Sequence, residues 1–547
     1  MFIKEEKISW ENGILPEKNY NREYPAPRPA QAGRRGRGKN KAGILRMVLV
    51  GIIVLVLLGL LGAAVIVLRE DIFWLFVVLE IAGVSEVLVL VSEKHNPAFT
   101  LAWVIIILSL PVFGYFLFLF WGRSGARGIK SGRMRAKIKE GFALLPKNPD
   151  ISAELGRAFP EQEKLSAYLV KEGFPVYRNT SCKYYPLGEL QFADMLRDLQ
   201  GARGFIFMEY FIVASGQLWD SVHTVLRQKA AEGVEVRLMY DDLGSISVLP
   251  PAIKTELEGE GIRVQSFNPV HKHISRLMLN YRNHQKIVVI DGEIAYTGGT
   301  NLADEYANLY DRFGHWKDTA VRLAGDAVWG LTVTFLQMWR IEDIGKKEDY
   351  EAYRPGGRER PKAEPGFFQP FNDGPVNHPH NPAEAVYRQM AYYSKKYLYI
   401  ATPYLVIDDA LTDALSLAAD SGVDVRVITP KKWDKWTVHM VTRANYGKLM
   451  QAGIRIYEYT PGFIHAKTVL SDDVHCVTGS INLDYRSLYL DFENGVWICG
   501  APVIQDIRRD MDETIAASEE IFYGDWKARP VPTRLMEFML KVFAPLL

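Results

Sequence analysis

The chain has 547 residues, of which 48% are hydrophobic, and its 65 lysines and arginines nearly balance 64 aspartates and glutamates. This length leaves room for several domains of about 100–200 residues each. The net charge of +1 argues against a globally basic nucleic-acid binder and against an acidic disordered chain. Three scattered cysteines, Cys182, Cys476 and Cys499, exclude a disulfide scaffold or a cysteine-rich zinc site. The mean hydropathy of −0.06 is too low for a polytopic transporter.

The N-terminal part begins with a basic tail and continues into a strongly apolar segment. Residues 1–46 are too long for the charged region of a signal peptide, and their proline, glycine and arginine content predicts a disordered tail. Residues 47–68 contain no charge. As a helix they would be about 33 Å long, enough to span a hydrocarbon core of about 30 Å.

Two further segments complete a predicted transmembrane region over 47–121. Residues 99–121 form a second strong candidate span, because Pro111 is tolerable in a membrane helix. Residues 72–91 are weaker, since Glu80 and Glu86 interrupt them. This segment either packs its acids against neighbouring helices or does not cross fully.

Basic residues without acids flank the apolar region on both sides, at 28–46 and at 123–139. By the positive-inside rule both flanks favour the cytoplasm, which requires an even number of crossings and conflicts with three candidate spans. The second flank carries more weight, because it is attached to the large domain. We therefore expect a multi-pass cell-membrane protein with its catalytic domains on the cytoplasmic side. The same cations either bind anionic headgroups or serve only to set the topology.

From about residue 140 the chain alternates β-rich runs with amphipathic helical stretches, which predicts an α/β fold. Two landmarks recur: the runs that begin at Gly233 and Gly261 return at Gly422 and Gly453. The offsets are 189 and 192 residues (422−233 and 453−261). Recurrence at a nearly constant offset indicates an internal duplication.

The duplication divides the remainder of the chain into two domains and a linker. The stretch 342–383 is charged and rich in proline and glycine, as expected of a linker. We therefore place the first domain at 122–341 and the second at 384–547.

One polar motif occurs in each unit. Both copies follow the pattern H-x-K, four residues, D, six residues, G-[GS]-x-N. The first copy supplies His284, Lys286, Asp291, Gly299 and Asn301, and the second supplies His465, Lys467, Asp472, Ser480 and Asn482. The β-rich sequence beside each motif predicts extended backbone, in which residues two apart share a face. Each histidine is therefore expected beside its lysine.

This set of side chains suits displacement at a phosphodiester. Lysine binds phosphate oxygens, and histidine acts near neutral pH as a nucleophile or proton carrier. The two asparagines, the Ser480 hydroxyl and the Gly299 amide offer neutral donors for developing charge. With both copies at one centre, one histidine attacks phosphorus while the other protonates the leaving oxygen. We expect no metal and no cofactor, because the lysine beside each histidine would repel a cation.

The two H-x-K-x4-D motifs resemble the signature of the phospholipase D superfamily, and their surroundings are similar to bacterial cardiolipin synthases. The resemblance covers roughly 72–547 and is carried by EYFI at 209–212, DDLGS at 241–245, NYRNH at 280–284, TPY at 402–404, NLDYRS at 482–487, DFE at 491–493 and NPAFTLAW at 96–103. Gln285 stands where this family usually has arginine, a departure that leaves the chemistry intact but can alter headgroup contacts.

The resemblance implies two α/β/α sandwich domains of the phospholipase D type, which meet at a pseudo-two-fold axis around one active site. It implies transfer of a phosphatidyl group between two phosphatidylglycerol molecules through a phosphohistidine, giving cardiolipin and glycerol. By analogy His284 is the nucleophile and His465 the general acid and base. The reverse assignment stays open, because the motifs are nearly symmetric.

The resemblance also implies roles for the other motif residues. Lys286, Lys467, Asn301 and Asn482 would bind phosphoryl oxygens. Glu493 and Asp318 match positions that orient the histidines. Asp291 and Asp472 belong to the catalytic motif, but we expect them to hold the loop after each strand.

Other functions remain open from the sequence alone. The same site could hydrolyse phosphodiesters, or transfer the phosphatidyl group to another alcohol. The near-zero charge, without a basic and aromatic face, argues against a membrane-tethered nuclease and against nucleic acid as a partner. Two complete motifs argue against a non-enzymatic lipid-binding scaffold. The apolar C-terminal stretch 536–547 is expected to pack on the domain rather than to touch lipid.

Overall fold

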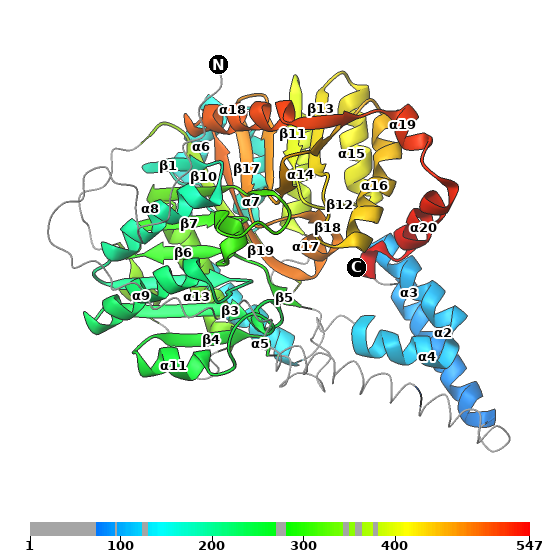
Figure 1. The fold of residues 1–547 in the computed structure, drawn as a ribbon, viewed down its shortest axis with the longest axis horizontal. Coiled ribbons are helices and arrows are strands. Elements are labelled where there is room, and N and C mark those ends of the chain that lie inside the picture. Colours follow the sequence, from blue (N-terminus) through cyan, green and yellow to red (C-terminus); the bar gives the residue numbers. More distant parts are fainter. Residues whose placement is uncertain are drawn as a thin grey trace.

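The computed structural model describes residues 59, 73–92, 96–122, 129–269, 281–342, 349–355, 364–375 and 381–546. These residues form two mixed β-sheets with their helices, and a smaller helical unit that projects from the second half (Figure 1). The predicted tail 1–46 lies outside the described residues, as does the predicted span 47–68 apart from Gly59.

The first sheet has seven strands in the order β1-β9-β7-β6-β2-β3-β4. Strands β2, β3 and β4 are parallel, and the remaining pairs are antiparallel. The strands are β1 (Thr180–Tyr185), β2 (Phe205–Tyr210), β3 (Glu235–Asp241), β4 (Arg263–Phe267), β6 (Ile287–Ile290), β7 (Ile294–Gly298) and β9 (Ala320–Gly325).

The second sheet repeats this order as β10-β19-β17-β16-β11-β13-β14, with β20 added at its edge. The strands are β10 (Phe367–Asp373), β11 (Tyr397–Ala401), β13 (Asp424–Pro430), β14 (Arg455–Tyr459), β16 (Thr468–Ser471), β17 (His475–Gly479), β19 (Asp491–Cys499) and β20 (Ser518–Ile521). The strands predicted after Gly233, Gly261, Gly422 and Gly453 are β3, β4, β13 and β14. The duplication read from the sequence is therefore a duplication of topology.

Alternate residues of each strand face two different cores. In β2, Ile206 and Met208 pack with the outer helices, whereas Phe205 and Phe207 face a core to which both halves contribute. The outer helices of the first sheet are α8 (Gly188–Gln200), α9 (Gln217–Ala231) and α11 (Ile253–Gly259). Those of the second sheet are α14 (Pro382–Tyr393), α15 (Asp409–Asp420) and α16 (Trp436–Gln451).

The shared core joins the inner faces of the two sheets. Its helices are α13 (Val328–Glu342), which is buried along almost its entire length, and α18 (Val503–Ala516). Two short parallel ladders also link the halves, one between β5 (Arg282–Asn283) and β19, and one between β15 (Gly462–Ile464) and β8 (His315–Lys317). The two halves therefore share one hydrophobic interior.

Strand β10 lies inside the stretch 342–383 that the sequence predicted as a linker. All seven of its residues are buried, and it pairs with β19 along its whole length. The charged, proline- and glycine-rich composition of the stretch misled at this point, and Pro370 and Asn372 within the strand are themselves poor strand formers. Their neighbours Phe367, Phe368 and Phe371 bury enough apolar surface for tertiary packing to override this preference.

The predicted span 99–121 is not one helix. It is divided into α3 (Pro97–Ser109), α4 (Pro111–Leu117) and a short π-helical turn (Phe118–Gly122). Leu110 leaves the helical region at φ −134° and ψ 69°, because the ring of Pro111 disfavours a helical conformation in the preceding residue. The break leaves α3 about 20 Å long.

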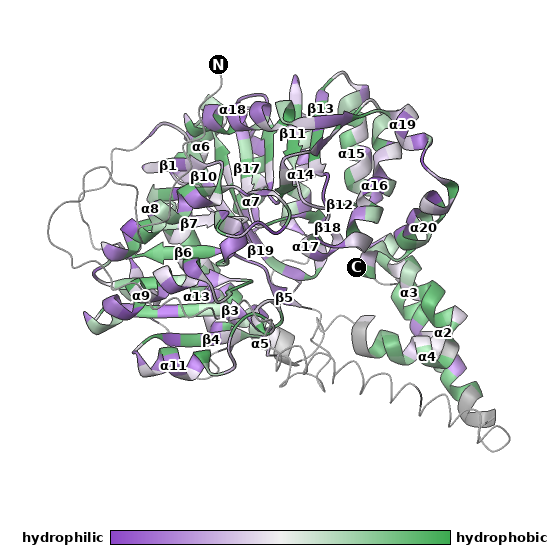
Figure 2. Ribbon diagram, in the orientation of Figure 1, coloured by the Kyte–Doolittle hydropathy of each residue, from purple (hydrophilic) through white to green (hydrophobic). Residues whose placement is uncertain are grey.

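The segment 72–91 is a continuous helix, α2 (Phe73–Ser92). It packs with α3 and α4 in a largely hydrophobic unit (Figure 2). Within the described parts of the chain, none of the helices has both the length and the apolar character that a membrane crossing requires.

A polar cluster attaches this helical unit to the second domain. The side chain of Asn96, which caps α3, donates to Asp408 Oδ2 and to Tyr489 Oη, each at 2.9 Å. Tyr489 in turn donates to Glu384 Oε2 at 2.7 Å. Tyr489 ends the short helix α17 (Tyr485–Tyr489), which lies on the segment between Asn482 and Glu493. The helical unit is thus anchored beside residues of the predicted site.

The chain ends in α19 (Tyr523–Lys527), α20 (Val531–Val542) and a 3-10 turn (Ala544–Leu546). Helix α20 packs against α16, in agreement with the expectation for 536–547, but it leaves a row of large apolar side chains exposed. Leu546 packs against the cluster formed by Leu90, Trp103, Ile107 and Phe118 of the helical unit. The C-terminal end of the chain therefore meets the helical unit at one side of the molecule (Figure 1).

Candidate active site

Each half of the molecule brings its motif histidine to a carboxylate of the other half. Strand β5 ends at Asn283 and pairs with the start of β19, so that His284 and Glu493 follow on adjacent strands. Strand β15 ends at Ile464 and pairs with β8, so that His465 and Asp318 are brought together in the same way. The backbone amides of the two histidines extend these ladders by donating to Phe492 O at 2.9 Å and to Lys317 O at 2.7 Å.

The side chains complete two reciprocal pairs across the domain boundary. His284 Nδ1 lies 2.8 Å from Glu493 Oε1, and His465 Nδ1 lies 2.6 Å from Asp318 Oδ2. Both carboxylates are fully buried. A proton on Nδ1 that is donated to the carboxylate leaves Nε2 with a free lone pair. Each imidazole can therefore present an unprotonated nitrogen to a substrate.

The two motif lysines lie in the same buried space as the histidines. Lys467 Nζ is 2.8 Å from His465 Nδ1 and also donates to the carbonyl of His465, as Lys286 does to that of His284. Burial lowers the pKa of Lys286 to about 7 and that of Lys467 to about 8, against the opposing effect of the buried carboxylates. His284 and Lys286 lie in the extended segment just before β6 rather than within that strand.

The electrostatics of the site favour neutral histidines at pH 7. Burial, with the Lys286 and Lys467 ammonium groups, holds the pKa of His284 well below its usual value. Burial and Lys467 lower the pKa of His465 to about 4, although Asp318 raises it. Four cationic or potentially cationic groups thus crowd one buried volume, which is the environment that a phosphate anion would stabilise.

Aromatic rings form the walls around the two histidines. Phe211 lies 4.9 Å from the His284 ring, and Tyr306 and Trp316 each lie 5.5 Å from the His465 ring, measured between centroids. These rings were not predicted as site residues, because each is an ordinary apolar position in its local pattern. They restrict water around the imidazoles and hold their planes.

The carboxylate of Asp318 occupies the space that a glycine leaves open. A Cβ atom on Gly299 would lie 2.1 Å from Asp318 Oδ1. The backbone amide of Gly299 donates to Thr319 O at 3.0 Å. The amide is therefore engaged within the protein, and the residue makes room for Asp318. The substrate contact expected of Gly299 stays a prediction.

Ser480 stands at the equivalent position of the second half and also serves a carboxylate. Its hydroxyl donates to Glu493, and its amide donates to Asn494 O at 2.9 Å. Since a hydroxyl has one proton to donate, the Ser480 hydroxyl is engaged with Glu493 in this geometry, and its contact with substrate stays a prediction. Gly299 thus lies against the shorter side chain of Asp318, and Ser480 lies against the longer side chain of Glu493.

The two motif asparagines are buried beside the histidines and partly engaged. Asn301 accepts from the amide of Ile212 at 3.0 Å and donates to Tyr306 Oη at 2.8 Å. Asn482 donates to Ser487 Oγ at 3.1 Å. Each amide nitrogen retains a second proton for a phosphoryl oxygen, so the predicted substrate-binding role of Asn301 and Asn482 stays a prediction.

The motif aspartates lie at the far end of the strands from the histidines. Asp291 accepts from the backbone amides of 203–205, and Asp472 accepts from those of 395–397. Both have positive φ, at 54° and 56°. These contacts tie the turn after β6 or β16 to the start of the neighbouring strand, which favours the structural role over a catalytic one.

Beneath His284 lies a buried polar network to which the sequence assigned no role. The side-chain amide of Asn283 donates to Glu209, and its backbone amide donates to Asp241 Oδ2 at 2.9 Å. Arg282 forms a buried ion pair with Asp241 at 3.2 Å. Burial raises the pKa of Glu209 to about 8. The position of β11 that corresponds to Glu209 is an alanine, Ala401. The two halves therefore differ in this network.

The neighbourhood of Gln285 is also buried. The side-chain amide of Gln285 donates to Glu493 O at 3.1 Å, which places this family-atypical residue against the strand that carries a site carboxylate.

Among the residues that the structure describes, no three His, Cys, Asp or Glu side chains gather as metal ligands.

Comparison with known proteins gives matches in both halves of the chain. A family model described as "Cardiolipin synthase, PLD-like domain" matches residues 195–311 and 387–515, one match in each half. Cardiolipin synthase 2 of Bacillus cereus is 33% identical over 84% of this chain and 89% of its own length. Cardiolipin synthase of Alkalihalophilus pseudofirmus is 31% identical over 84% of this chain and 91% of its own.

Two other similarities extend the picture. An uncharacterized protein of Streptococcus mutans is 38% identical over 85% of this chain and 100% of its own length. The crystal structure of phosphatidylserine synthase from Haemophilus influenzae superposes with a TM-score of 0.53 at 14% identity, covering 71% of this chain and 98% of that one. The structural match supports the fold. Taken with the sequence matches, it shows that the chain belongs to the cardiolipin synthase family of the phospholipase D superfamily, with two phospholipase D-like domains in one polypeptide.

Proposed function

We propose that the protein is a cardiolipin synthase, which transfers a phosphatidyl group from one phosphatidylglycerol to a second and releases glycerol. The observation that carries the proposal is the pair of reciprocal contacts, His284 with Glu493 and His465 with Asp318, in one volume with two lysines. Two oriented imidazoles in a cationic site match the needs of a two-step displacement at phosphorus.

In the first step, His284 Nε2 attacks the phosphorus of phosphatidylglycerol. The new P–N bond replaces the P–O bond to the glycerol headgroup, and His465 gives its Nε2 proton to the departing alkoxide. Lys286 and Lys467 stabilise the charge on the non-bridging oxygens. Glycerol and a phosphatidyl-histidine result.

In the second step, a terminal hydroxyl of another phosphatidylglycerol attacks the same phosphorus. His465 Nε2 accepts the hydroxyl proton, a P–O bond forms, and the P–N bond breaks to return His284 to its starting state. The product is cardiolipin, and no net proton is gained or lost. The reverse roles of the two histidines remain compatible with the near-symmetry of the site.

The charge of the substrate supplies the protonation state that the first step needs. With no anion present, burial together with the two lysines lowers the pKa of His465 to about 4, so that it is neutral at pH 7. A phosphodiester bound between the lysines offsets their charge and raises the pKa of His465, since an opposite charge nearby favours the protonated form. The general acid is thus charged when substrate is present.

The membrane is the proposed location, on the evidence of the predicted apolar segments and of a substrate that stays in the bilayer. We place the catalytic domains on the cytoplasmic side, following the basic flank at 123–139. Phosphatidylglycerol and cardiolipin are the expected lipid partners.

Purified protein with phosphatidylglycerol in mixed micelles tests the reaction. Cardiolipin and glycerol should appear in equal amounts without added nucleotide. Phosphatidic acid as the sole lipid product would instead identify a hydrolase and contradict the synthase. Rapid acid-free quenching and peptide mapping of the phosphohistidine then distinguishes His284 from His465 as the nucleophile.

A further inference from the structure

Helix α20 has an unusual distribution of polar and apolar side chains. Its one fully buried side chain is a charged one, Glu537, which forms a bidentate ion pair with Arg529 at 2.6 and 2.8 Å. Most of its large apolar side chains are exposed, whereas Leu540 packs against the core. The C-terminal apolar face consists of Val531, Leu535, Met536, Phe538 and Met539, which are 42–72% exposed.

Such a face is not expected on a helix that only packs on a domain. A helix packed on a globular core places its apolar stripe inward, whereas α20 turns part of this stripe outward. An amphipathic helix with an exposed apolar face and flanking cations is typical of helices that lie in the plane of a membrane interface. Arg534 and Lys541, both exposed, are the cations on this helix.

The apolar helical unit lies next to the end of α20. Leu546, which follows α20 directly, packs against Trp103, Ile107 and the rest of their cluster. The unit itself exposes large apolar residues, at 54–67%: Ile81 and Leu88 of α2, and Leu101 and Leu108 of α3. Helix α20 and the helical unit lie on the same side of the molecule (Figures 1 and 2), so a single bilayer surface can cover both sets of side chains.

We infer that α20 lies in the membrane interface and inserts the C-terminal apolar face among the lipid acyl chains, next to the helical unit. This inference rests on the proposed function to the extent that the substrate is a bilayer lipid. It adds a lipid contact to the packing on the domain that the sequence led us to expect and that α20 makes with α16. In this position the helix would hold the second domain close to the lipid surface from which substrate enters.

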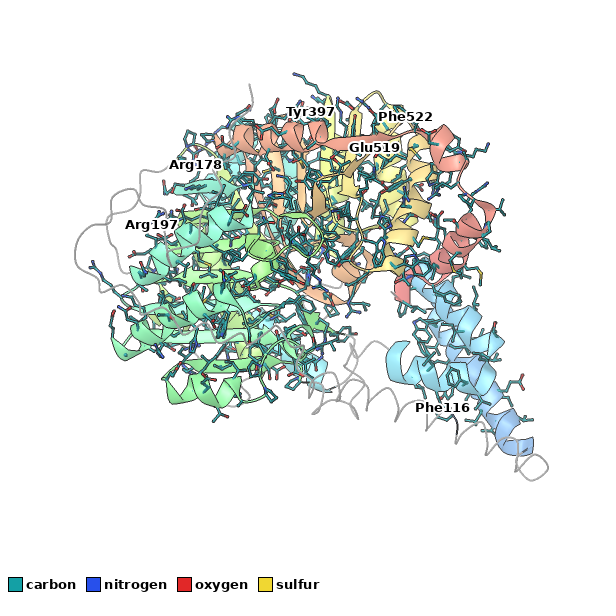
Figure 3. All side chains as sticks on the ribbon, in the orientation of Figure 1. Phe116, Arg178, Arg197, Tyr397, Glu519 and Phe522 are labelled. Carbon is teal, nitrogen blue, oxygen red and sulfur yellow. The ribbon has the colours of Figure 1, made fainter. Side chains whose placement is uncertain are left out.

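Site-specific labelling of the full-length protein tests the depth of α20. The described cysteines, Cys182, Cys476 and Cys499, are all buried, so an introduced surface cysteine can be labelled selectively with an environment-sensitive fluorophore. Phe538→Cys places the probe on the C-terminal apolar face. Phe522→Cys is the matched control, because Phe522 is a comparably exposed aromatic, 61% against 67%, and lies well away from the helical unit that carries Phe116 (Figure 3).

The labelled proteins are reconstituted in vesicles of phosphatidylcholine and phosphatidylglycerol. We expect spin-labelled acyl chains to quench the probe at 538 at least threefold more than the probe at 522, and aqueous iodide to quench only the latter. Equal quenching of both probes by iodide would overturn the inference. Protection of the probe at 538 from both quenchers would also overturn it, since protein rather than lipid would then cover the face.

Two further measurements separate failure of this inference from other failures. Leu535→Cys tests the same face independently, and both sites are exposed, so the fold should tolerate either change. Cardiolipin formation is measured in the same vesicles. An active protein whose probe at 538 is exposed to water would refute the docking of α20 and leave the proposed function standing. Insertion of the probe into the membrane without cardiolipin formation would support the docking of α20 and contradict the proposed function.

Discussion

Replacing Asp318 by asparagine is the sharpest perturbation that the structure offers. Asp318 Oδ1 accepts a hydrogen bond from the amide of Thr319 at 2.9 Å, and Oδ2 faces His465 Nδ1 at 2.6 Å. In Asp318→Asn the first contact selects the rotamer that keeps oxygen against Thr319. The amide nitrogen then faces His465, donates to Nδ1 and moves the imidazole proton to Nε2, which is the wrong tautomer for accepting a proton from substrate.

The size of the effect follows from the buried, charged character of this contact. A hydrogen bond to a charged group contributes about 1.5–3 kcal/mol, and each 1.4 kcal/mol corresponds to a factor of about ten. The wrong tautomer adds to this loss, as in other histidine–carboxylate pairs where the amide variant loses about 10⁴ in kcat. We therefore expect kcat for cardiolipin formation to fall by about 10² to 10⁴.

The pH dependence of the stability of Asp318→Asn supplies a second, independent readout. Asp318 raises the pKa of His465, which burial and Lys467 lower to about 4. Because the folded-state pKa lies below the unfolded value, the stability due to His465 is present above pH 6.5 and is lost as pH falls towards 4. Removing the Asp318 charge lowers the folded-state pKa further, so the variant should lose more stability at acid pH than the wild type.

The assay compares cardiolipin formation with cleavage of a phosphatidyl ester whose leaving group departs without a proton. If His465 is the general acid, the defect of Asp318→Asn should be much smaller on the activated ester. Asp506→Asn, on an exposed carboxylate of α18, is the control and should behave as wild type. An Asp318→Asn protein within threefold of wild type on phosphatidylglycerol, with an unchanged pH profile, would refute the reasoning.

Three further predictions concern the support of the site. In Gly299→Ala the new Cβ would lie 2.1 Å from Asp318 Oδ1, so we expect a loss of about 1–3 kcal/mol in unfolding free energy and at least a tenfold loss of activity; Gly259→Ala, which meets no atom within 4 Å, should be neutral in both assays. Asn96→Ala removes two hydrogen bonds between the helical unit and the second domain together with the side-chain cap of α3, and should increase protease cleavage at this junction while unfolding of the two sheets and their helices is unchanged. Glu209→Gln should remove a pH dependence of stability. Burial raises the pKa of Glu209 to about 8, so the contribution of this group to wild-type stability is fully present below pH 4.5 and falls by about 4–5 kcal/mol up to pH 8. The variant should therefore gain stability relative to wild type as pH rises, as measured by thermal unfolding.

Each of these three predictions has a contrary outcome. A fully active Gly299→Ala protein would mean that the carboxylate moves aside easily. Unchanged proteolysis of Asn96→Ala would show that apolar packing alone attaches the helical unit. A constant stability difference between Glu209→Gln and wild type from pH 5 to 8 would show that Glu209 does not hold a proton in the folded state.

The sequence by itself determined the repeated α/β architecture and the residues that carry its motif. Both depend on short-range patterns: alternating strands and helices, the recurrence of landmarks at offsets of 189 and 192 residues (422−233 and 453−261), and two copies of H-x-K-x4-D. These patterns depend only on the order and spacing of residues along the chain. The strands after Gly233 and Gly422 could therefore be predicted without knowledge of their contacts.

Where a local pattern conflicts with packing, the sequence misled. The charged, proline- and glycine-rich composition of 342–383 indicated a linker, but three buried phenylalanines make β10 a strand. Pro111 was compatible with a continuous span, yet the chain turns there into a second helix. Side-chain burial and the direction of the chain after a break depend on neighbours that a window of sequence does not contain.

Only the tertiary structure decided how the site is assembled. His284 meets Glu493 across 209 residues of sequence, and His465 meets Asp318 across 147. The resemblance suggested that these carboxylates orient histidines, but the exchange between halves arises from the short ladders β5–β19 and β15–β8. The same packing uses the amide of Gly299 and the hydroxyl of Ser480 within the protein. Composition and periodicity predict only what neighbouring residues along the chain determine, whereas these contacts depend on how the two sheets pack against each other.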